Sequence, residues 1–313
     1  MTGSGRAGAG LRGVDVGVDD LIGLRFRAQR LELSVARRAR RSLVGAHGSR
    51  FRGRGMEFAE SRIYQPGDDV RSIDWRVTAR TGRPHTKLFQ EERERPVILV
   101  VDLGASMFFG TRTAYKSVVA AEAAALVAWA AMRGGDRVGA LVAGRSAHME
   151  LEPQSGRRGV LRVLRALAAL CHRPDEDEEQ RIRLSESLVR ARHVARPGSL
   201  IVVISDFYDL DEEAVGSLSR LRQHNDMLAC WIHDRLEIEP PPPGRYTVSD
   251  GWQTATLDSV GAHARQRYRE SFRAEHERLR ATLGRLAIAW LPIATGDDVA
   301  EALRRGAAPE ARP

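Results

Sequence analysis

Oxygen-bearing side chains follow two of the most apolar stretches of this sequence. Asp102 ends one β-branched run, and Ser106 lies four residues beyond it. Asp206 ends another such run. If both runs are strands of one parallel sheet, their carboxyl ends meet at one edge and these side chains lie together. Two carboxylates and a hydroxyl are hard oxygen ligands, which suit Mg²⁺ or Mn²⁺ with water completing the shell. The spacing therefore allows a divalent-cation site. The alternative is that both aspartates only cap the following helices or bind loop amides.

Strands and helices must alternate from residue 96 onward to bring these residues to one edge. Apolar runs of strand length are separated by longer stretches with helical periodicity. This alternation predicts an α/β fold, a Rossmann-like three-layer domain with a mostly parallel sheet and helices on both faces. The expected strands are 96–102, 136–144, 147–153, 199–206, 226–234 and 288–294, with 245–249 as an edge strand; the expected helices are 113–133, 159–170, 180–195, one opening at Asp211, 262–285 and 297–305.

The positive charge is confined to the first third of the chain. The net charge is +8 and the isoelectric point about 10.2, yet residues 96–313 carry 29 basic and 29 acidic side chains. In residues 1–49 a loose Gly-rich stretch precedes a basic amphipathic helix, expected from Asp20 to Leu43. This helix suits a membrane surface, a partner, or docking on the following domain, and we favour docking. Nucleic acid is disfavoured, because no binding signature is recognisable and aromatic residues make up only 6%.

Residues 50–95 are dense in Gly, Pro and charge, which predicts an accessory segment of turns and short strands. Two interpretations of its charged cluster stay open. One is a partner-docking surface, since Trp and Arg are enriched at interface hot spots. The other, which we favour, is a turn held by internal Arg–carboxylate pairs with the tryptophan buried. The residues concerned are Arg62, Asp68, Asp69, Arg71, Asp74 and Trp75.

Two stretches of the chain resemble known families. VVDLGASM resembles the start of a von Willebrand factor A-type domain, whose metal-ion-dependent adhesion site begins Asp-x-Ser-x-Ser. A longer run, GMEFAESRIYQPGDDVRSIDWRVTAR followed by KLFQEERERPVILVVD, resembles the bacterial domain of unknown function 58 family. The resemblance covers roughly residues 50–295. Its most specific pieces are Glu57-Phe58, Arg62, Tyr64, Gly67-Asp68-Asp69, Arg71, Ile73-Asp74-Trp75 and Ala79-Arg80.

The resemblance implies an A-type domain built for binding, in which a metal ion bridges to a carboxylate of the partner. Members are thought to act with MoxR-type AAA+ ATPases in the maturation or assembly of other proteins. Many carry an N-terminal transmembrane hairpin, and this chain resembles the short soluble form. It departs from the metal-site pattern at Gly104, which has no side-chain oxygen, and in EPQSGRRG, which lacks the expected threonine. Asp102, Ser106 and Asp206 remain as ligands for Mg²⁺ or Mn²⁺.

Catalysis is not expected. The chain contains no GxSxG elbow, GxxxxGK[ST] loop or HExxH helix, and Gly104 stands where an aspartyl phosphotransferase would need a second carboxylate. A metal-dependent hydrolase is therefore a remote alternative. Two scattered cysteines, Cys171 and Cys230, fit a reducing compartment, and the longest uncharged run, 286–296, is too short to cross a membrane.

The sequence therefore predicts a cytoplasmic, non-enzymatic protein-binding domain, whose partners are a MoxR-type ATPase and an unknown client protein. The alternative is a basic N-terminal module that binds nucleic acid or a membrane surface. The expected division is 1–49, the accessory segment 50–95, the A-type domain 96–296, and a C-terminal helix and tail, 297–313.

Overall fold

The chain divides into two compact units, Leu43–Glu94 and the remainder. The expected helix beyond residue 31 lies outside the described residues, and so does the C-terminal tail after residue 307. The computed structural model describes residues 10–31, 56–65, 68–91, 95–172, 182–249 and 254–307.

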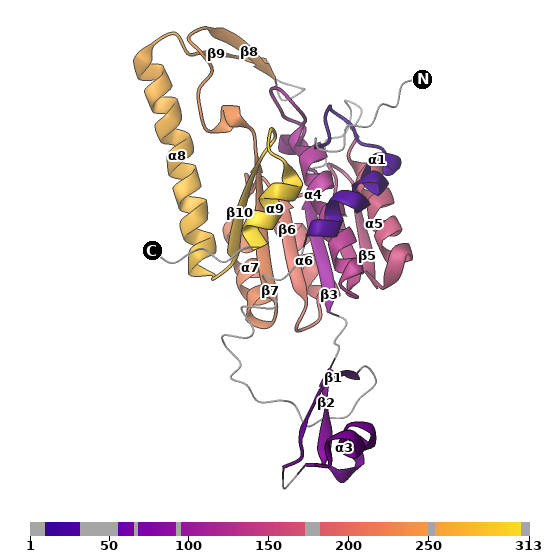
Figure 1. The fold of residues 1–313 in the computed structure, drawn as a ribbon. Coiled ribbons are helices and arrows are strands. Elements are labelled where there is room, and N and C mark those ends of the chain that lie inside the picture. Colours follow the sequence, from indigo (N-terminus) through magenta and orange to yellow (C-terminus); the bar gives the residue numbers. More distant parts are fainter. Residues whose placement is uncertain are drawn as a thin grey trace. The chain divides into compact units, whose positions relative to one another are not determined.

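A six-stranded sheet forms the centre of the larger unit (Figure 1). The strand order is β10-β7-β6-β3-β4-β5, with β5 antiparallel to β4 and every other pair parallel. Chain order reverses between β3 and β6, which makes their carboxyl ends a topological switch point. The strands are β3 (Pro96–Asp102), β4 (Arg137–Ala143), β5 (His148–Gln154), β6 (Leu200–Ser205), β7 (Asp226–His233) and β10 (Ala289–Ala294).

Helices cover both faces of this sheet, because the central strands are apolar on both sides. On β3, Val97, Leu99 and Val101 join one core, and Ile98 and Val100 join the other. The predicted three-layer arrangement of a mostly parallel sheet between helices is confirmed. One face carries α1 (Val18–Gly23), the 3₁₀ segment η1 (Leu24–Arg30), α4 (Lys116–Arg133), α5 (Gly156–Leu170) and α9 (Val299–Ala307); the other carries α6 (Leu184–Val194), α7 (Glu212–His224) and α8 (Ala262–Arg285).

Helix α4 is the most enclosed helix in the described part of the larger unit. Every residue from Lys116 to Ala131 is buried. Its many alanines leave little side chain between the helix backbone and the layers on either side, so α4 packs closely beneath the N-terminal segment. Two of these enclosed residues, Lys116 and Glu122, are charged and therefore need partners inside the fold.

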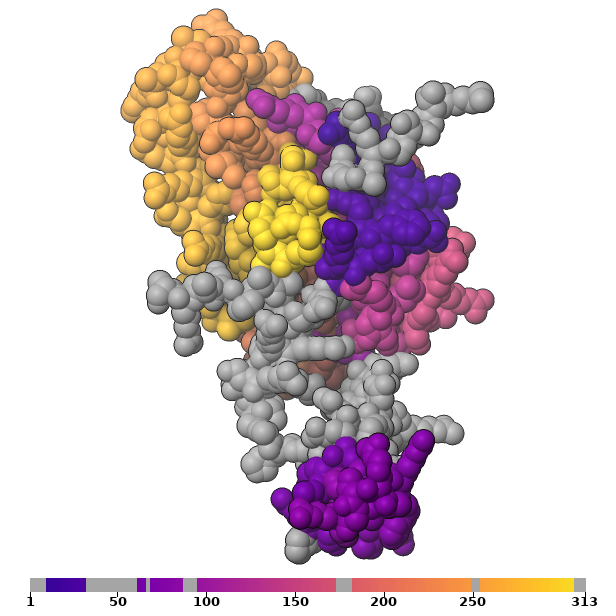
Figure 2. Space-filling model, in the orientation of Figure 1, coloured from indigo at the N-terminus to yellow at the C-terminus, as the bar shows by residue number. Residues whose placement is uncertain are grey.

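The N-terminal segment docks on α4 as predicted, but it is not one long helix. α1 ends at Gly23, a 3₁₀ turn follows, and Leu31 is already extended. The indole Nε1 of Trp129 donates to the Leu21 carbonyl oxygen at 3.0 Å. The indigo N-terminal segment and yellow α9 lie side by side on this face (Figure 2), joined by the ion pair of Arg27 with Asp298.

The residues 245–249 are a strand, but not an edge strand of the main sheet. β8 (Arg245–Ser249) pairs antiparallel with β9 (Thr254–Asp258) in a separate two-stranded sheet. This hairpin leads into α8, and none of the helices within the described ranges is long and apolar enough to cross a membrane.

The smaller unit contains a two-stranded antiparallel sheet, β1 (Met56–Ile63) with β2 (His85–Glu91). Between them lie the 3₁₀ turn η2 (Val70–Ser72) and the helix α3 (Trp75–Thr81), which was not predicted from the sequence. Gly82 caps the C-terminus of α3, and its φ of 70° is left-handed and suits glycine.

The ion pair between Arg27 and Glu122 offers a test of how the N-terminal segment is held. Glu122 is almost fully enclosed, and its carboxylate accepts from Arg27 Nη1 at 2.5 Å and from the backbone N–H of Leu11 at 2.7 Å. Burial raises the pKa of Glu122, and the two donors oppose that rise. Arg27→Met leaves a buried carboxylate without its cation, so we expect a loss of about 3 kcal/mol in the free energy of unfolding.

Urea titration measures this loss. Arg273→Met removes an exposed pair with Glu277 on α8, and this control should change stability by less than about 0.5 kcal/mol. Equal effects of the two substitutions would contradict the role given to Arg27.

Candidate binding site at the carboxyl edge of the sheet

The loops after β3 and β6 meet at the switch point of the sheet. Val101 of β3 is in register with Ile204 of β6, so Asp102 and Ser205 follow on adjacent strands. The 3₁₀ turn η3 (Ala105–Met107) continues from β3, and Asp206 continues from β6. The edge therefore brings Asp102 and Asp206 to neighbouring strand ends, as the alternation of strands and helices predicts.

Asp102 links these two loops. Its Oδ2 accepts from Ser205 Oγ at 2.7 Å, and its Oδ1 accepts from the backbone N–H of Gly104 at 2.9 Å. The same Ser205 hydroxyl oxygen accepts from the backbone N–H of Phe207 at 2.9 Å. Burial, together with the negative charge of Asp206, raises the pKa of Asp102 to about 6.

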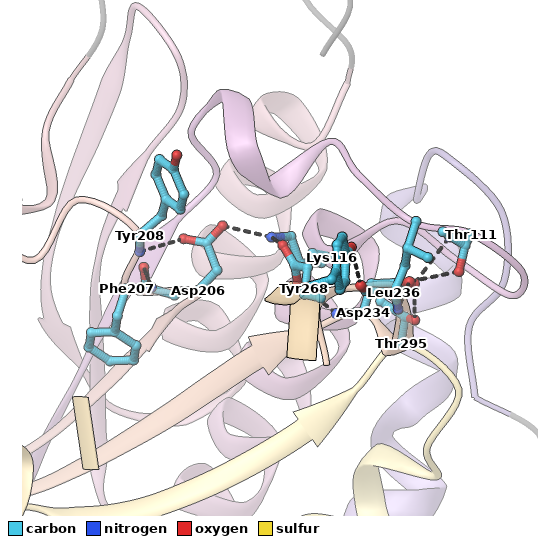
Figure 3. A network of polar contacts seen from close by, with 11 residues as sticks. Thr111, Lys116, Asp206, Phe207, Tyr208, Asp234, Leu236, Tyr268 and Thr295 are labelled. Carbon is cyan, nitrogen blue, oxygen red and sulfur yellow. Dashed lines mark hydrogen bonds and ion pairs between the residues drawn. The ribbon is translucent and has the colours of Figure 1, made fainter. Parts of the chain in front are cut away.

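Asp206 is paired with a buried lysine. Its Oδ2 accepts from Lys116 Nζ at 2.8 Å, and its Oδ1 accepts from the backbone N–H of Tyr208 at 3.1 Å (Figure 3). Lys116 Nζ also donates to Glu237 Oε1 at 2.6 Å, and the lysine side chain is 1% exposed. Burial alone would lower the pKa of Lys116, but the charges of Asp206 and Glu237 raise it above its ordinary value. The ammonium group therefore stays charged.

The loop after β6 is held in an unusual conformation. Phe207 has a φ of +55°, which is costly for a residue with a side chain, and its ring is buried. The hydrogen bonds from Phe207 to Ser205 and from Tyr208 to Asp206 keep the loop in place. As a result the next side chain, Tyr208, points out of the loop and is 82% exposed (Figure 3).

A further carboxylate, Asp234, joins three other parts of the edge. It follows β7 and accepts from Thr111 Oγ1 at 2.6 Å and from Thr295 Oγ1 at 2.7 Å (Figure 3). Burial would raise its pKa, but these hydroxyl donors lower it below the ordinary value. The backbone N–H of Asp234 donates to Glu237 Oε2 at 2.8 Å in the 3₁₀ turn η4 (Arg235–Glu237), so the Lys116 cluster and the Asp234 cluster share Glu237.

Of the three expected metal ligands, Asp102 and Asp206 have donors on both carboxylate oxygens, and Ser106 is half-buried in η3. A Cβ at Gly104 would lie 3.0 Å from Asp102 Oδ1, and glycine adds no oxygen ligand. In the part of the chain that the structure describes, no group of three or more His, Cys, Asp or Glu is arranged to hold a metal.

The charge at Asp206 decides whether these residues fit a dication. An ammonium group already lies 2.8 Å from Asp206 Oδ2 and would repel a divalent ion at that carboxylate. With Lys116 in this position, Asp102, Ser106 and Asp206 do not fit Mg²⁺ or Mn²⁺. Three residues of this edge were not predicted from the sequence, namely Lys116, Glu237 and Tyr208. One signal was present for Lys116: it is one of only two lysines in a chain whose other basic residues are arginines.

In the smaller unit, the candidate partner-binding acids serve the unit itself. Arg62 Nη2 pairs with Asp68 Oδ1 at 2.8 Å. The Asp69 side chain accepts from the backbone N–H of Arg71 at 2.9 Å. Asp74 caps α3 by accepting from the backbone N–H groups of residues 76 and 77, and also accepts from Ser61 Oγ at 3.0 Å.

Trp75 is different from these acids. It is 71% exposed, so the interpretation with a buried tryptophan is wrong on this point. Val70 and Ile63 of the same unit are also exposed. The internal Arg–carboxylate pair and the caps are present, whereas the aromatic side chain is not part of them.

Comparisons with known proteins place the chain beside bacterial relatives. A family model described as "Protein of unknown function DUF58" matches residues 60–282. "Uncharacterized protein Mb1516" of Mycobacterium bovis and "Uncharacterized protein Rv1480" of Mycobacterium tuberculosis are each 35% identical over 220 residues, 70% of this chain and 68% of the relative. Among solved structures, the conserved hypothetical protein BatB of Bacteroides thetaiotaomicron matches with a TM-score of 0.43 and 14% identity, over 68% of this chain and 96% of that one.

The hydroxyl of Ser205 tests the link between the two loops. Ser205→Ala removes a donor to Asp102 and an acceptor for Phe207, both enclosed, so we expect a loss of about 2 kcal/mol in the free energy of unfolding. The matched control is Ser217→Ala on α7, because the Ser217 hydroxyl is buried without a hydrogen-bond partner in the described structure. Denaturant titration should show the control to be neutral or stabilising; an equal loss in both would contradict the link.

His233, at the end of β7, gives a pH test. Its ring stacks on Trp231 with centroids 3.9 Å apart, and burial lowers its pKa to about 4. Since the ordinary value is near 6.5, the unfolded chain takes up the extra proton between those values. Stability from this group is therefore complete above pH 6.5 and falls as the pH drops towards 4, by about 2 kcal/mol between pH 7.5 and pH 5.

The measurement is the free energy of unfolding at both pH values for the wild type and for His233→Phe. The phenyl ring keeps an aromatic contact with Trp231 but has no titrating group. The substituted chain should lose about 2 kcal/mol less between the two pH values. The same pH dependence in both chains would show that His233 is not the group responsible.

Proposed function

The chain belongs to the DUF58 family, which is described only as proteins of unknown function. We therefore propose a function from the geometry of the chain's own site. The larger unit is a von Willebrand factor A-type, non-enzymatic domain that binds another protein at the carboxyl edge of its sheet. The doubly wound strand order, with the switch point between β3 and β6 and an antiparallel strand at one edge, supports the A-type assignment. The family match supports the resemblance on which this expectation rests.

The observation that carries the proposal is the exposure of Tyr208 on a loop that hydrogen bonds hold in place. Tyrosine supplies a large apolar surface with a polar tip, and such residues dominate the binding energy of many interfaces. A side chain presented by a rigid loop loses little conformational entropy when a partner covers it. The hydrogen bonds from Phe207 to Ser205 and from Tyr208 to Asp206 hold the backbone that leads to Tyr208, so its side chain is already positioned for binding.

The polar groups beneath Tyr208 support binding more than catalysis. The Ser205 hydroxyl is buried and committed to Asp102 and Phe207, and Lys116 is enclosed between two carboxylates. Neither is placed to attack a substrate that approaches the edge from solvent. The network instead fixes the loops that a partner would contact.

The proposed partner is a MoxR-type AAA+ ATPase, acting with this chain in the cytoplasm on a client protein that is to be matured or assembled. This partner follows from the family resemblance, and the carboxyl edge is where we place its contact. The loop at Tyr208 is the surface that we assign to this contact.

Tyr208→Ala tests the proposal. We expect it to weaken binding of the MoxR-type ATPase of the same genome by at least about tenfold, the effect of losing an aromatic hot spot. Biolayer interferometry with purified full-length chain measures the affinity. The control is Phe26→Ala, which removes another exposed aromatic ring, on η1 and not on the loop after β6. Wild-type affinity in a folded Tyr208→Ala chain would overturn the proposed surface.

A further inference from the structure

We propose that the ammonium group of Lys116 is a built-in cation that replaces a divalent metal ion at the carboxyl edge, so that this edge is complete without metal. The inference goes beyond the proposed function, because it concerns the charge balance of the larger unit and involves no partner. It is carried by the position of Lys116 between Asp206 and Glu237 and by the small number of oxygen ligands around them.

The lysine is placed by the loop that precedes α4. Its backbone N–H donates to the Phe109 carbonyl oxygen at 2.8 Å, which closes the loop from 109 to 116. Gly110 makes this closure possible, since a Cβ there would lie 2.1 Å from the Ala114 carbonyl oxygen. The side chain then runs inward, and Nζ reaches two carboxylates at 2.8 and 2.6 Å (Figure 3).

The charges at this place require a cation. Asp206 and Glu237 come from different loops, and both are largely enclosed. Two carboxylates brought together away from water repel each other unless a positive charge lies between them. Lys116 supplies that charge from within the chain, and the Phe109 ring faces its Nζ with the centroid 5.9 Å away.

The ligand supply matches an ammonium group better than a metal ion. An ammonium group has three donors and needs three acceptors at most, whereas Mg²⁺ requires six oxygen ligands in near-octahedral geometry. Gly104 offers no side-chain oxygen, and the Asp102 oxygens are engaged by Ser205 and Gly104. Asp206 and Glu237 therefore satisfy Lys116, and for as long as the ammonium group holds their oxygens a dication finds too few free ligands.

Removing the lysine while leaving space should therefore create a metal site. Lys116→Ala frees the volume of the side chain and leaves two carboxylates without a cation. Lys116→Met removes the same charge but fills the volume. The probe is Mn²⁺ alone, added to the purified full-length chain and followed by calorimetric titration and by thermal unfolding with and without EDTA.

We expect no saturable Mn²⁺ binding and no change in Tm for the wild type. Both substituted chains should melt below the wild type. Mn²⁺ should bind Lys116→Ala and raise its Tm by about 3 °C or more, and should leave the Tm of Lys116→Met unchanged.

Two results would overturn the inference. One is saturable Mn²⁺ binding by the wild type that Asp206→Asn weakens by at least about tenfold, because a metal ion would then use the carboxylate assigned to Lys116. The other is a folded Lys116→Ala chain that binds no Mn²⁺. If Lys116→Ala does not fold, the comparison of the wild type with Asp206→Asn decides alone. Mn²⁺ binding by the wild type that is lost in Asp206→Asn overturns the inference. The absence of Mn²⁺ binding by the wild type supports it.

Discussion

The larger unit is organised around a buried helix that carries charge. Helix α4 is enclosed along most of its length, and a charged side chain in such a place needs a partner brought to it. Lys116, in the first turn of α4, forms ion pairs with Asp206 and Glu237 from the loops after β6 and β7. Glu122, farther along the helix, forms an ion pair with Arg27 of the N-terminal segment. The apolar side chains provide most of the buried area, and the two charges determine which segments cover the N-terminal half of the helix.

The same buried charges connect the loops of the carboxyl edge to one another. A hydrogen bond of Asp102 connects the loop after β3 to the loop after β6. The ion pairs of Lys116 connect the loop after β6 to η4. The hydrogen bonds of Asp234 connect η4 to the ends of β7 and β10. Each connection joins segments that are far apart in the sequence. The edge therefore behaves as one connected body, and the exposed side chain that it presents has a defined position.

The sequence predicts some of this and misses the rest for physical reasons. Asp102 and Asp206 could be placed together because parallel strands end at one edge, a rule that needs only the strand pattern. Lys116 could not be assigned to that edge, because it begins a helix and its direction depends on the loop closed at Phe109. The end of the N-terminal helix was missed since its apolar spacing continues into a 3₁₀ turn. The exposure of Trp75 was missed because composition does not tell which side of a small helix is covered.

The burial of Lys116 also has a chemical consequence. Only the uncharged amine is a nucleophile, and this amine is held as an ammonium group behind two carboxylates. Acylating reagents that modify surface lysines would therefore find it inert for as long as α4 stays under the sheet edge. The chain has only two lysines, so the acylation of Lys116 can be followed separately. Its rate would report how often the edge opens.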